Sequence, residues 1–429
     1  MLQSQGFTVV PGAVMERWAK REGNLCFRAE IGVAGIGKTG LSINAEYWDG
    51  RTLYESEGML GSSVFSMLIH PAGFLGPDPT LDDILERMED IREEVGLGDP
   101  RVKAFAGAIS RNDETKVKSL LNAHPSYFTS KKRGWLRETF LHEAHTRRIV
   151  LALISAGFDV NATDVSGNTP LHRTVSPGVI SALLQSGGDP NRKNEEGNTP
   201  LYETIRYDRL MGASLLLHSG ADPNMQNNTG LACLHVVTSG DAVPLLMEFD
   251  ANPNLADSFG RTPLHYARDS EICNLLMRRG ASVIADSKGA LPIHTAQTVD
   301  ALEYFITQGM DAFAIDADGQ TPLHYAVRSN RRAVVKYLLL KAGFRLIDKG
   351  HVNARDVNGL TALHLASDTA IARLLIQAGA DVMARDVNRK TPLHHCSSNN
   401  IMKQLIAAGA DVSATDDAGK TPLDYPKSN

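Results

Sequence analysis

The sequence predicts an all-α repeat solenoid of about ten helix pairs with β-hairpin turns, preceded by a small α+β domain. The first observation is a four-residue phrase that returns ten times, from Thr139-Phe140-Leu141-His142 to Thr421-Pro422-Leu423-Asp424. Its copies begin at residues 139, 169, 199, 232, 262, 291, 321, 361, 391 and 421. The second observation is their spacing of about 30 residues, with one interval near 33 and one near 40, which is the period range of helical solenoids. Residues 1–99 lack the phrase and are therefore expected to form a separate domain.

Composition narrows the class of partner. Of 429 residues, 44 are basic and 49 acidic, which gives a formal net charge of -5. A chain without a strong positive field is a poor candidate for binding nucleic acid or an anionic membrane surface. We find no run of about 18 apolar residues and no basic-then-apolar start, so we expect a cytoplasmic protein with no membrane span. Cys26, Cys233, Cys273 and Cys396 are far apart, which argues against a disulfide framework or a zinc site.

Residues 257–280 illustrate how each repeat is built. Asp257 and Gly260 are typical of a tight turn, because the Asp side chain accepts turn N–H groups and Gly permits a positive φ. Thr262 is placed to cap a short helix whose first position is Pro263. A second helix follows, with a leucine pair that faces the next repeat and a glycine that predicts a left-handed C-cap.

This pattern resembles the ankyrin repeat family. Asp356 to Ala366 reads DVNGLTALHLA and Gly379 to Asn388 reads GADVMARDVN, close to the family pattern D-x-x-G-x-T-P-L-H-x-A followed by G-A-D-V-N. The resemblance covers about residues 101–429, with an opening repeat at 101–135, copies from residue 139 onward and a truncated end from 421. It implies an ankyrin array whose turn tips and first helices line a concave surface for a protein partner.

Departures from the family pattern lead to separate expectations. Several copies are about three residues short between their two helices, so their first helices should be clipped. Arg389 stands where other turns have Gly, which puts the geometry of that one hairpin in question. Pro426 falls soon after the last phrase, so the last helix should be stunted. An insertion at residues 341–352 is either a longer second helix that buries its apolar side chains, which is favoured, or a contact loop.

The first 99 residues have a different texture. We expect a short helix at 11–21, strands at 26–33, 41–48 and 52–59, and a helix at 80–95. Residues 32–39 match G-x-x-x-x-G-K-[ST], a phosphate-binding loop. That loop needs a helix directly after it, whereas a strand-like alternation follows here, so a hairpin turn is favoured over a nucleotide site.

Nothing in the pattern predicts a catalytic residue, a cofactor site or a metal site. Fourteen histidines are present, and eight of them are the fourth letter of the repeated phrase. Successive copies lie one repeat apart, whereas metal ligands must converge on one ion. Local hydrogen bonds at the helix starts therefore explain these histidines better than a metal does.

Residues that vary between copies at the turn tips and at the first-helix ends are the candidates for binding a partner. They are Glu195, Glu196, Arg206, Tyr207, Thr229, Ser258, Phe259, Arg261, Arg268, Asp269 and Lys288. Phe259 is the main candidate, because a large apolar ring on a turn tip is typical of a covered surface. The prediction is a non-catalytic protein that binds another protein and is a monomer when unbound. Two alternatives remain open: a bacterial immunity or inhibitor protein that masks a toxin or enzyme, and an enzyme or nucleotide-binding activity in residues 1–99.

Overall fold

The computed structural model describes residues 99–124, 126–129, 138–340, 349–396 and 398–425, together with the backbone of five strands between residues 8 and 54. The chain divides into two compact units, residues 1–166 and 167–429, and each is described by itself. Among the described residues, no helix has the length and apolar character needed to cross a membrane.

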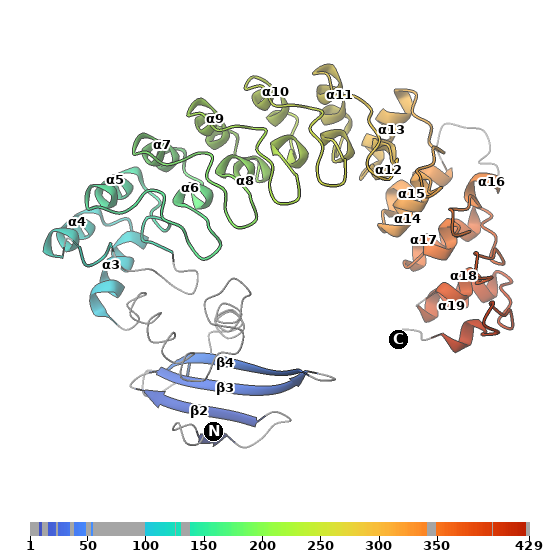
Figure 1. The fold of residues 1–429 in the computed structure, drawn as a ribbon, viewed down its shortest axis with the longest axis horizontal. Helices are drawn as coiled ribbons and strands as arrows, with labels where there is room; N and C mark the ends of the chain where they lie inside the picture. The colour runs from blue at the N-terminus through green and yellow to red at the C-terminus, as the bar shows by residue number, and fades with distance from the viewer. Residues whose placement is uncertain are drawn as a thin grey trace. The chain divides into compact units, whose positions relative to one another are not determined.

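The strands of the first unit form an antiparallel meander in the order β1-β2-β3-β4-β5 (Figure 1). They are β1 (Thr8–Val10), β2 (Glu16–Glu22), β3 (Leu25–Ala34), β4 (Lys38–Trp48) and β5 (Leu53–Tyr54). The strands predicted at 26–33 and 41–48 are confirmed, and β5 lies within the one predicted at 52–59. The helix predicted at 11–21 is wrong, because β2 pairs along its whole length with β3. Pairing with a neighbouring strand overrides local helix propensity here. The helix predicted at 80–95 lies outside the described residues.

The opening helix pair is present in the first unit. Helices α3 (Pro100–Ser110) and α4 (Glu114–Ala123) are joined by a tight turn, where Asn112 has a φ of 55°. Helix α5 (Arg147–Ser155) packs next to α4. The rings of Phe105 and Phe128 stack at a centroid distance of 4.1 Å, and Phe140 meets Phe105 edge-on at 4.7 Å. These fully buried rings form the core of the opening repeat.

The second unit repeats a first helix, a second helix and a hairpin turn (Figure 1). The first helices are α6 (Pro170–Arg173), α8 (Pro200–Arg206), η2 (Cys233–Val236), η3 (Pro263–His265), α12 (Pro292–Thr295), α14 (Pro322–Arg328), η4 (Ala362–Leu365), α18 (Pro392–His395) and η5 (Pro422–Asp424). The second helices are α7 (Pro177–Gln185), α9 (Leu210–His218), α10 (Ala242–Met247), α11 (Ser270–Arg278), α13 (Val299–Thr307), α15 (Arg332–Leu340), α17 (Thr369–Gln377) and α19 (Asn399–Ala407). A short helix, α16 (Lys349–Val352), precedes the turn at Asp356. The insertion predicted at 341–352 lies mostly outside the described residues.

The clipped first helices are confirmed. Helices α8 and α14 have seven residues each, whereas the other described first helices of this unit have three or four. These two helices begin the repeats with the longest spacing, so the missing residues come from the last turn of the first helix. The last of the series, η5, is a three-residue 3-10 turn, as Pro426 predicts.

The hairpin turn at Arg389 has the same geometry as the turn at Gly260, although glycine is missing from it. Its φ is 60°, close to the 77° of Gly260 in another turn. The Asp386 N–H donates to Lys390 O at 2.8 Å, and the Arg389 N–H donates to Asp386 O at 3.0 Å. The turn at Gly260 makes the same two bonds. A side chain in this left-handed region costs roughly 1–2 kcal/mol, so the array tolerates a local strain at Arg389.

The phrase histidines join successive repeats. In the repeat of His265, the Thr262 N–H donates to Nδ1 at 3.1 Å, and Nε2 lies 3.0 Å from Ala290 O in the next turn. Because Nδ1 accepts an N–H, the ring proton is on Nε2 and is donated to the carbonyl oxygen. The same pair of contacts is made by His172, His235, His294, His324, His364 and His394. The hydrogen-bonding role predicted for these residues is confirmed.

Candidate functional site

The hairpin turns of the second unit join into a continuous hairpin edge, defined here as the turn residues from Glu195 to Ala418. The Ser258 N–H donates to Thr229 O at 3.1 Å, and the Ser287 N–H donates to Phe259 O at 2.9 Å. Equivalent bonds link every neighbouring pair of turns: Asn228 to Glu196, Ala317 to Lys288, Val357 to Asp318, Val387 to Asn358 and Asp417 to Asn388. One backbone hydrogen bond per repeat therefore links the backbone of each turn on this edge to that of the next.

The candidate residues fall into two groups. Those on the hairpin edge are Glu195, Glu196, Thr229, Ser258, Phe259, Arg261 and Lys288, and those at the ends of first helices are Arg206, Tyr207, Arg268 and Asp269. Nine of the eleven are exposed, while Arg261 and Asp269 are half-buried. The hydrogen bonds between turns bring the first group together. The seven-residue length of α8 places Arg206 roughly 10 Å along the helix axis from the turn, at 1.5 Å per residue.

Phe259 and Tyr207 are the large exposed rings among the candidates, with 61% and 58% of their surface exposed. The Phe259 N–H donates to Asp257 Oδ1 at 2.8 Å, and the Arg261 guanidinium carbon lies 5.7 Å from the Phe259 ring centroid. The guanidinium carbon of Arg209 lies 4.9 Å from the Tyr207 ring. Both rings are thus held beside a cation on one face and open to solvent elsewhere.

Two of the candidate residues, Arg261 and Asp269, also stabilise the fold. Arg261 Nε donates to Asp286 Oδ2 at 3.0 Å, and the Asp286 side chain is 1% exposed. Burial alone raises the pKa of Asp286, but the Ala290 N–H and the Arg261 guanidinium outweigh it and hold that pKa below its usual value. Asp269 accepts the Ile272 N–H at 2.8 Å and caps α11. Their substitution would therefore perturb stability as well as binding.

The turn aspartates follow a pairing rule that sequence reasoning missed. Each Oδ1 accepts N–H groups of its own turn, as Asp416 Oδ1 does from Ala418 and Lys420 at 2.9 Å. In the six turns that begin with an aspartate from Asp257 to Asp416, Oδ2 then takes one side-chain donor. In four repeats the donor comes from the residue nine positions later: Tyr266 to Asp257, Tyr325 to Asp316, His395 to Asp386 and Tyr425 to Asp416.

In two other repeats the donor comes from the preceding turn. Arg261 reaches Asp286, and Gln320 Nε2 donates to Asp356 Oδ2 at 3.1 Å. Asp286 and Asp356 are followed nine positions later by Thr295 and Leu365, which make no such bond. The sequence does contain the pattern: a turn aspartate has either a Tyr or His nine positions later or an Arg or Gln at the end of the preceding turn. That these residues bond the aspartate can be recognised only from the contacts between repeats.

The phosphate-loop motif lies in a β-hairpin. β3 ends at Ala34 and β4 begins at Lys38, and the two residues are antiparallel partners. The last two residues of the motif therefore lie on a strand, where a nucleotide site needs a helix N-terminus. The paired strands at both ends of the motif agree with the hairpin interpretation, and residues 35–37 lie outside the described residues. Within the part of the chain that is described, no group of three or more His, Cys, Asp or Glu side chains is arranged to hold a metal ion.

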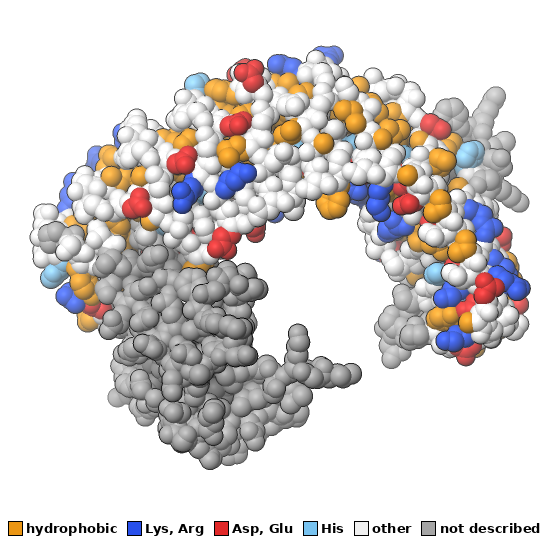
Figure 2. All heavy atoms as spheres, in the orientation of Figure 1, with side chains coloured by type: hydrophobic (Ala, Val, Ile, Leu, Met, Phe, Trp, Pro, Cys, Tyr) orange, Lys and Arg blue, Asp and Glu red, His pale blue; other side chains and the backbone are white. Residues whose placement is uncertain are grey.

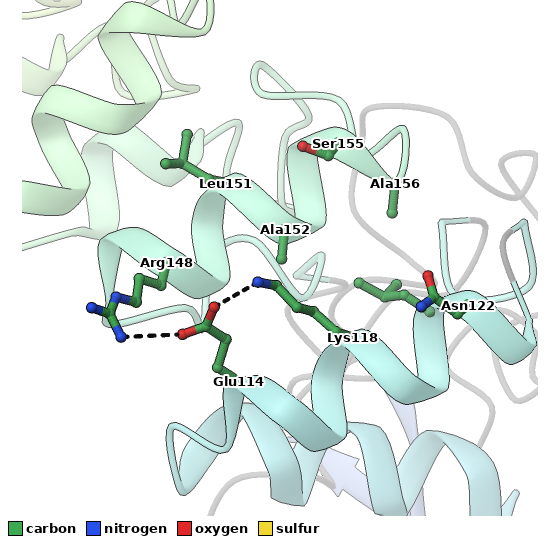
Figure 3. A pocket seen from close by; sticks show the side chains of 9 residues that line it. Glu114, Lys118, Asn122, Arg148, Leu151, Ala152, Ser155 and Ala156 are labelled. Atoms are coloured by element: carbon green, nitrogen blue, oxygen red, sulfur yellow. Dashed lines mark hydrogen bonds and ion pairs between the residues drawn. The ribbon is translucent and has the colours of Figure 1, made fainter.

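A groove of about 650 Å³ lies between α4 and α5 in the first unit (Figure 3). Glu114 lies between two cations, with Lys118 Nζ at 2.7 Å and Arg148 Nη1 at 3.7 Å. Leu121 and Leu151 add apolar surface to the lining. Two cations share the single carboxylate of Glu114, so the lining keeps one net positive charge, and both cations are already engaged by that carboxylate.

Known families and proteins agree with this architecture. A three-copy ankyrin repeats model matches residues 141–227, 212–287 and 268–347, and a single ankyrin repeat model matches 358–387 and 388–417. The chain is 32% identical over 97 residues to the B-cell lymphoma 3 protein homolog of Mus musculus, covering 21% of each chain. It is 30% identical over 118 residues to the B-cell lymphoma 3 protein of Homo sapiens, covering 26% of this chain and 25% of that one. The chain thus matches no more than about a quarter of the length of these relatives. Since the family matches span more than half of its residues, this protein belongs to the ankyrin repeat family, whose repeats indicate protein–protein interaction.

Proposed function

We propose that this protein is a non-catalytic binding protein that holds a protein partner along the hairpin edge and the first helices of residues 167–429. The observation that carries the proposal is Phe259. Its ring is 61% exposed, yet its backbone is held on both sides, by Asp257 Oδ1 at 2.8 Å and by the Ser287 N–H at 2.9 Å. An aromatic ring on a fixed backbone loses little conformational entropy on binding, which is typical of an interface anchor.

The surroundings of Phe259 suit a protein partner. Thr229, Ser258 and Lys288 lie on the same edge and are exposed, so a polar rim surrounds one apolar ring. The net charge of -5 favours a protein over nucleic acid or an anionic membrane. The proposal takes the unbound chain to be a cytoplasmic monomer, with residues 1–99 as a separate domain.

The test compares two exposed apolar side chains of the edge. The intact chain first captures its partner from native lysate, and the partner is identified by mass spectrometry and purified. Full burial of a phenylalanine ring stabilises by about 1.5–3 kcal/mol, so Phe259→Ala should weaken the dissociation constant about tenfold. Val387, 60% exposed on a distant turn, provides the control variant Val387→Ala.

Isothermal titration should show weaker binding for Phe259→Ala, with a thermal midpoint close to that of the wild type. A large loss of stability with unaltered binding would show that Phe259 belongs to the core and would overturn the proposal. Equal weakening by Val387→Ala would remove the special role of Phe259.

A further inference from the structure

Lys390 is the exception to the pairing rule of the turn aspartates. It occupies the same turn position as Arg261 and Gln320, which donate to the aspartate of the next turn. The aspartate that Lys390 would reach is Asp416, but Asp416 Oδ2 already accepts the Tyr425 hydroxyl. Two positions can supply the donor to a turn aspartate: the last residue of the preceding turn and the residue nine positions after the aspartate. In the other repeats only one of these two residues donates to the aspartate. Here both positions carry a donor, so one cation is surplus.

The displaced ammonium group lies over an aromatic ring. Lys390 Nζ is 4.6 Å from the ring centroid of Tyr425, and Nζ of Lys420, one repeat later, is 5.9 Å from the same centroid. Lys420 is exposed, while Lys390 and Tyr425 are half-buried. Among the described residues, no ion pair within 4.0 Å joins either lysine to a carboxylate.

Two carboxylates that interact with Lys390, those of Asp386 and Asp416, are already hydrogen-bonded to other groups. Asp386 accepts the Asn388 and Lys390 N–H groups through Oδ1 and bonds His395 through Oδ2 at 2.8 Å. Asp416 is occupied in the same way by its own turn and by Tyr425. Two ammonium groups therefore converge on one ring. Asp386 and Asp416 attract Lys390, and Asp424 attracts Lys420. None of these carboxylates makes an ion pair within 4.0 Å with either lysine, and a bound anion would supply that direct contact.

We infer that Lys390, Lys420 and Tyr425 form a binding site for an acidic peptide segment of the protein partner. This inference rests on the proposed function and specifies the chemistry of the partner. Two lysines on adjacent turns match two or three carboxylates in an extended segment, and the Tyr425 ring offers an apolar face between them.

The surrounding charges favour a short acidic segment over a polyanion. Asp417 and Asp424 are exposed next to the two lysines, and Arg389 Nε lies 3.9 Å from Asp417 Oδ1. Figure 2 shows acidic side chains next to basic ones over these C-terminal repeats. A continuous phosphate backbone would meet these carboxylates, whereas a few peptide carboxylates can reach the lysines alone.

The test uses the full chain and a fluorescein-labelled ten-residue peptide that carries three adjacent glutamates among glycines and serines, with binding followed by fluorescence anisotropy at low salt. Exposed ion pairs contribute about 0.2–1 kcal/mol each, so Lys390→Gln with Lys420→Gln should weaken binding about fivefold. The matched control is Lys336→Gln with Lys403→Gln, which removes two exposed lysines from the second helices α15 and α19 and leaves the same net charge. The control should change binding less than twofold.

Tyr425→Phe tests the pairing rule itself. It keeps the ring and both lysines but frees Asp416 Oδ2, which Lys390 then pairs with, as Arg261 does with Asp286. Peptide binding should therefore weaken although no cation is lost. Adding Asp416→Asn should restore binding, and Asn is compatible with this turn position because Asn194 and Asn227 occupy it elsewhere. A site that needed only the lysines would give the same affinity in all three proteins.

The outcomes separate this inference from the proposed function. Equal weakening by the two double lysine variants would show a nonspecific charge effect and overturn the site. Tighter binding of a ten-residue DNA oligonucleotide, lost in the Lys390 and Lys420 variant, would assign the site to nucleic acid instead. One outcome is that the purified partner binds the Lys390→Gln, Lys420→Gln variant as tightly as the wild type while Phe259→Ala weakens partner binding. In that case the proposed function stands and this inference fails.

Discussion

Acid should destabilise the array through its buried histidines, and His364 gives the size of the effect. Its side chain is 4% exposed; Nδ1 accepts the Thr361 N–H at 3.1 Å and Nε2 donates to Lys390 O at 3.2 Å. Burial, and then the charge that His395 can carry at a ring distance of 5.5 Å, lower the pKa of His364 from 6.5 to about 4. Protonation would place a second hydrogen on Nδ1, opposite the Thr361 N–H.

The direction of the stability change follows from the pKa of His364 in the unfolded state, 6.5, and in the folded state, about 4. Between pH 6.5 and about 4, the unfolded state binds a proton that the folded state excludes, so the free energy of unfolding falls as the pH falls. At 1.36 kcal/mol per pKa unit, His364 alone removes roughly 3 kcal/mol over this range. Burial shifts the pKa of His235, His265, His294 and His324 in the same direction. The aspartates with lowered pKa, Asp286 and Asp386 among them, lose their contribution only below about pH 3.8.

Urea denaturation followed by circular dichroism at steps from pH 7.5 to 4.5 measures the loss, and NMR titration of the histidine ring protons gives the pKa of His364. His364→Gln, which cannot titrate, should lose its share of the pH dependence. His395→Gln should raise the pKa of His364, because it removes the second cause of the shift. An imidazole at His364 that titrates near 6.5, or an unchanged pH slope in His364→Gln, would refute the reasoning.

Arg389→Gly should raise the free energy of unfolding by about 0.5 kcal/mol in urea denaturation, because the relief of left-handed strain exceeds the entropy that glycine adds to the unfolded chain. A lower free energy of unfolding would mean that the Arg389–Asp417 ion pair contributes more than the strain costs. Gly230→Ala should lower it by more than about 2 kcal/mol, since a Cβ would lie 2.5 Å from Ser258 N at a φ of 81°. Gly280→Ala, with a φ of 90° and nothing within 4 Å, should lose only about 1 kcal/mol, and equal losses would contradict this account of the turns. Lys38→Ala should leave any binding of ATP or GTP in a titration unchanged, because β4 begins at that residue; nucleotide binding that depends on Lys38 would contradict this.

Most of the array could be predicted from the sequence because its determinants are local. The positions of the phrase, the clipped first helices and the left-handed glycines depend on residues within one turn or helix end. The strand that begins at Lys38, in place of a helix, was predictable for the same reason. The error at residues 11–21 arose where the outcome depends on a partner: Glu16–Glu22 has charged, helix-compatible residues, and strand pairing decides its conformation.

The candidate site was only partly predictable. Exposure of Phe259 and Tyr207 followed from their positions in the repeat, and Asp269 is a cap residue of a type that the sequence alone can indicate. The bond between Arg261 and Asp286 and the surplus of Lys390 join residues 25 or more positions apart. Such contacts depend on how one repeat is placed against the next, which no single turn specifies.

Each phrase histidine from His172 to His394 bonds its own repeat through Nδ1 and the next repeat through Nε2. These bonds determine where the chain can be truncated without loss of a hydrogen-bond partner. A fragment that stops at Gly379, after the second helix α17, would strand the Nε2 proton of His364, whose acceptor is Lys390 O. One that continues through the hairpin to Lys390 keeps that acceptor. Truncations for biophysical work should therefore end after a hairpin, so that each retained imidazole keeps the carbonyl that belongs to its neighbour.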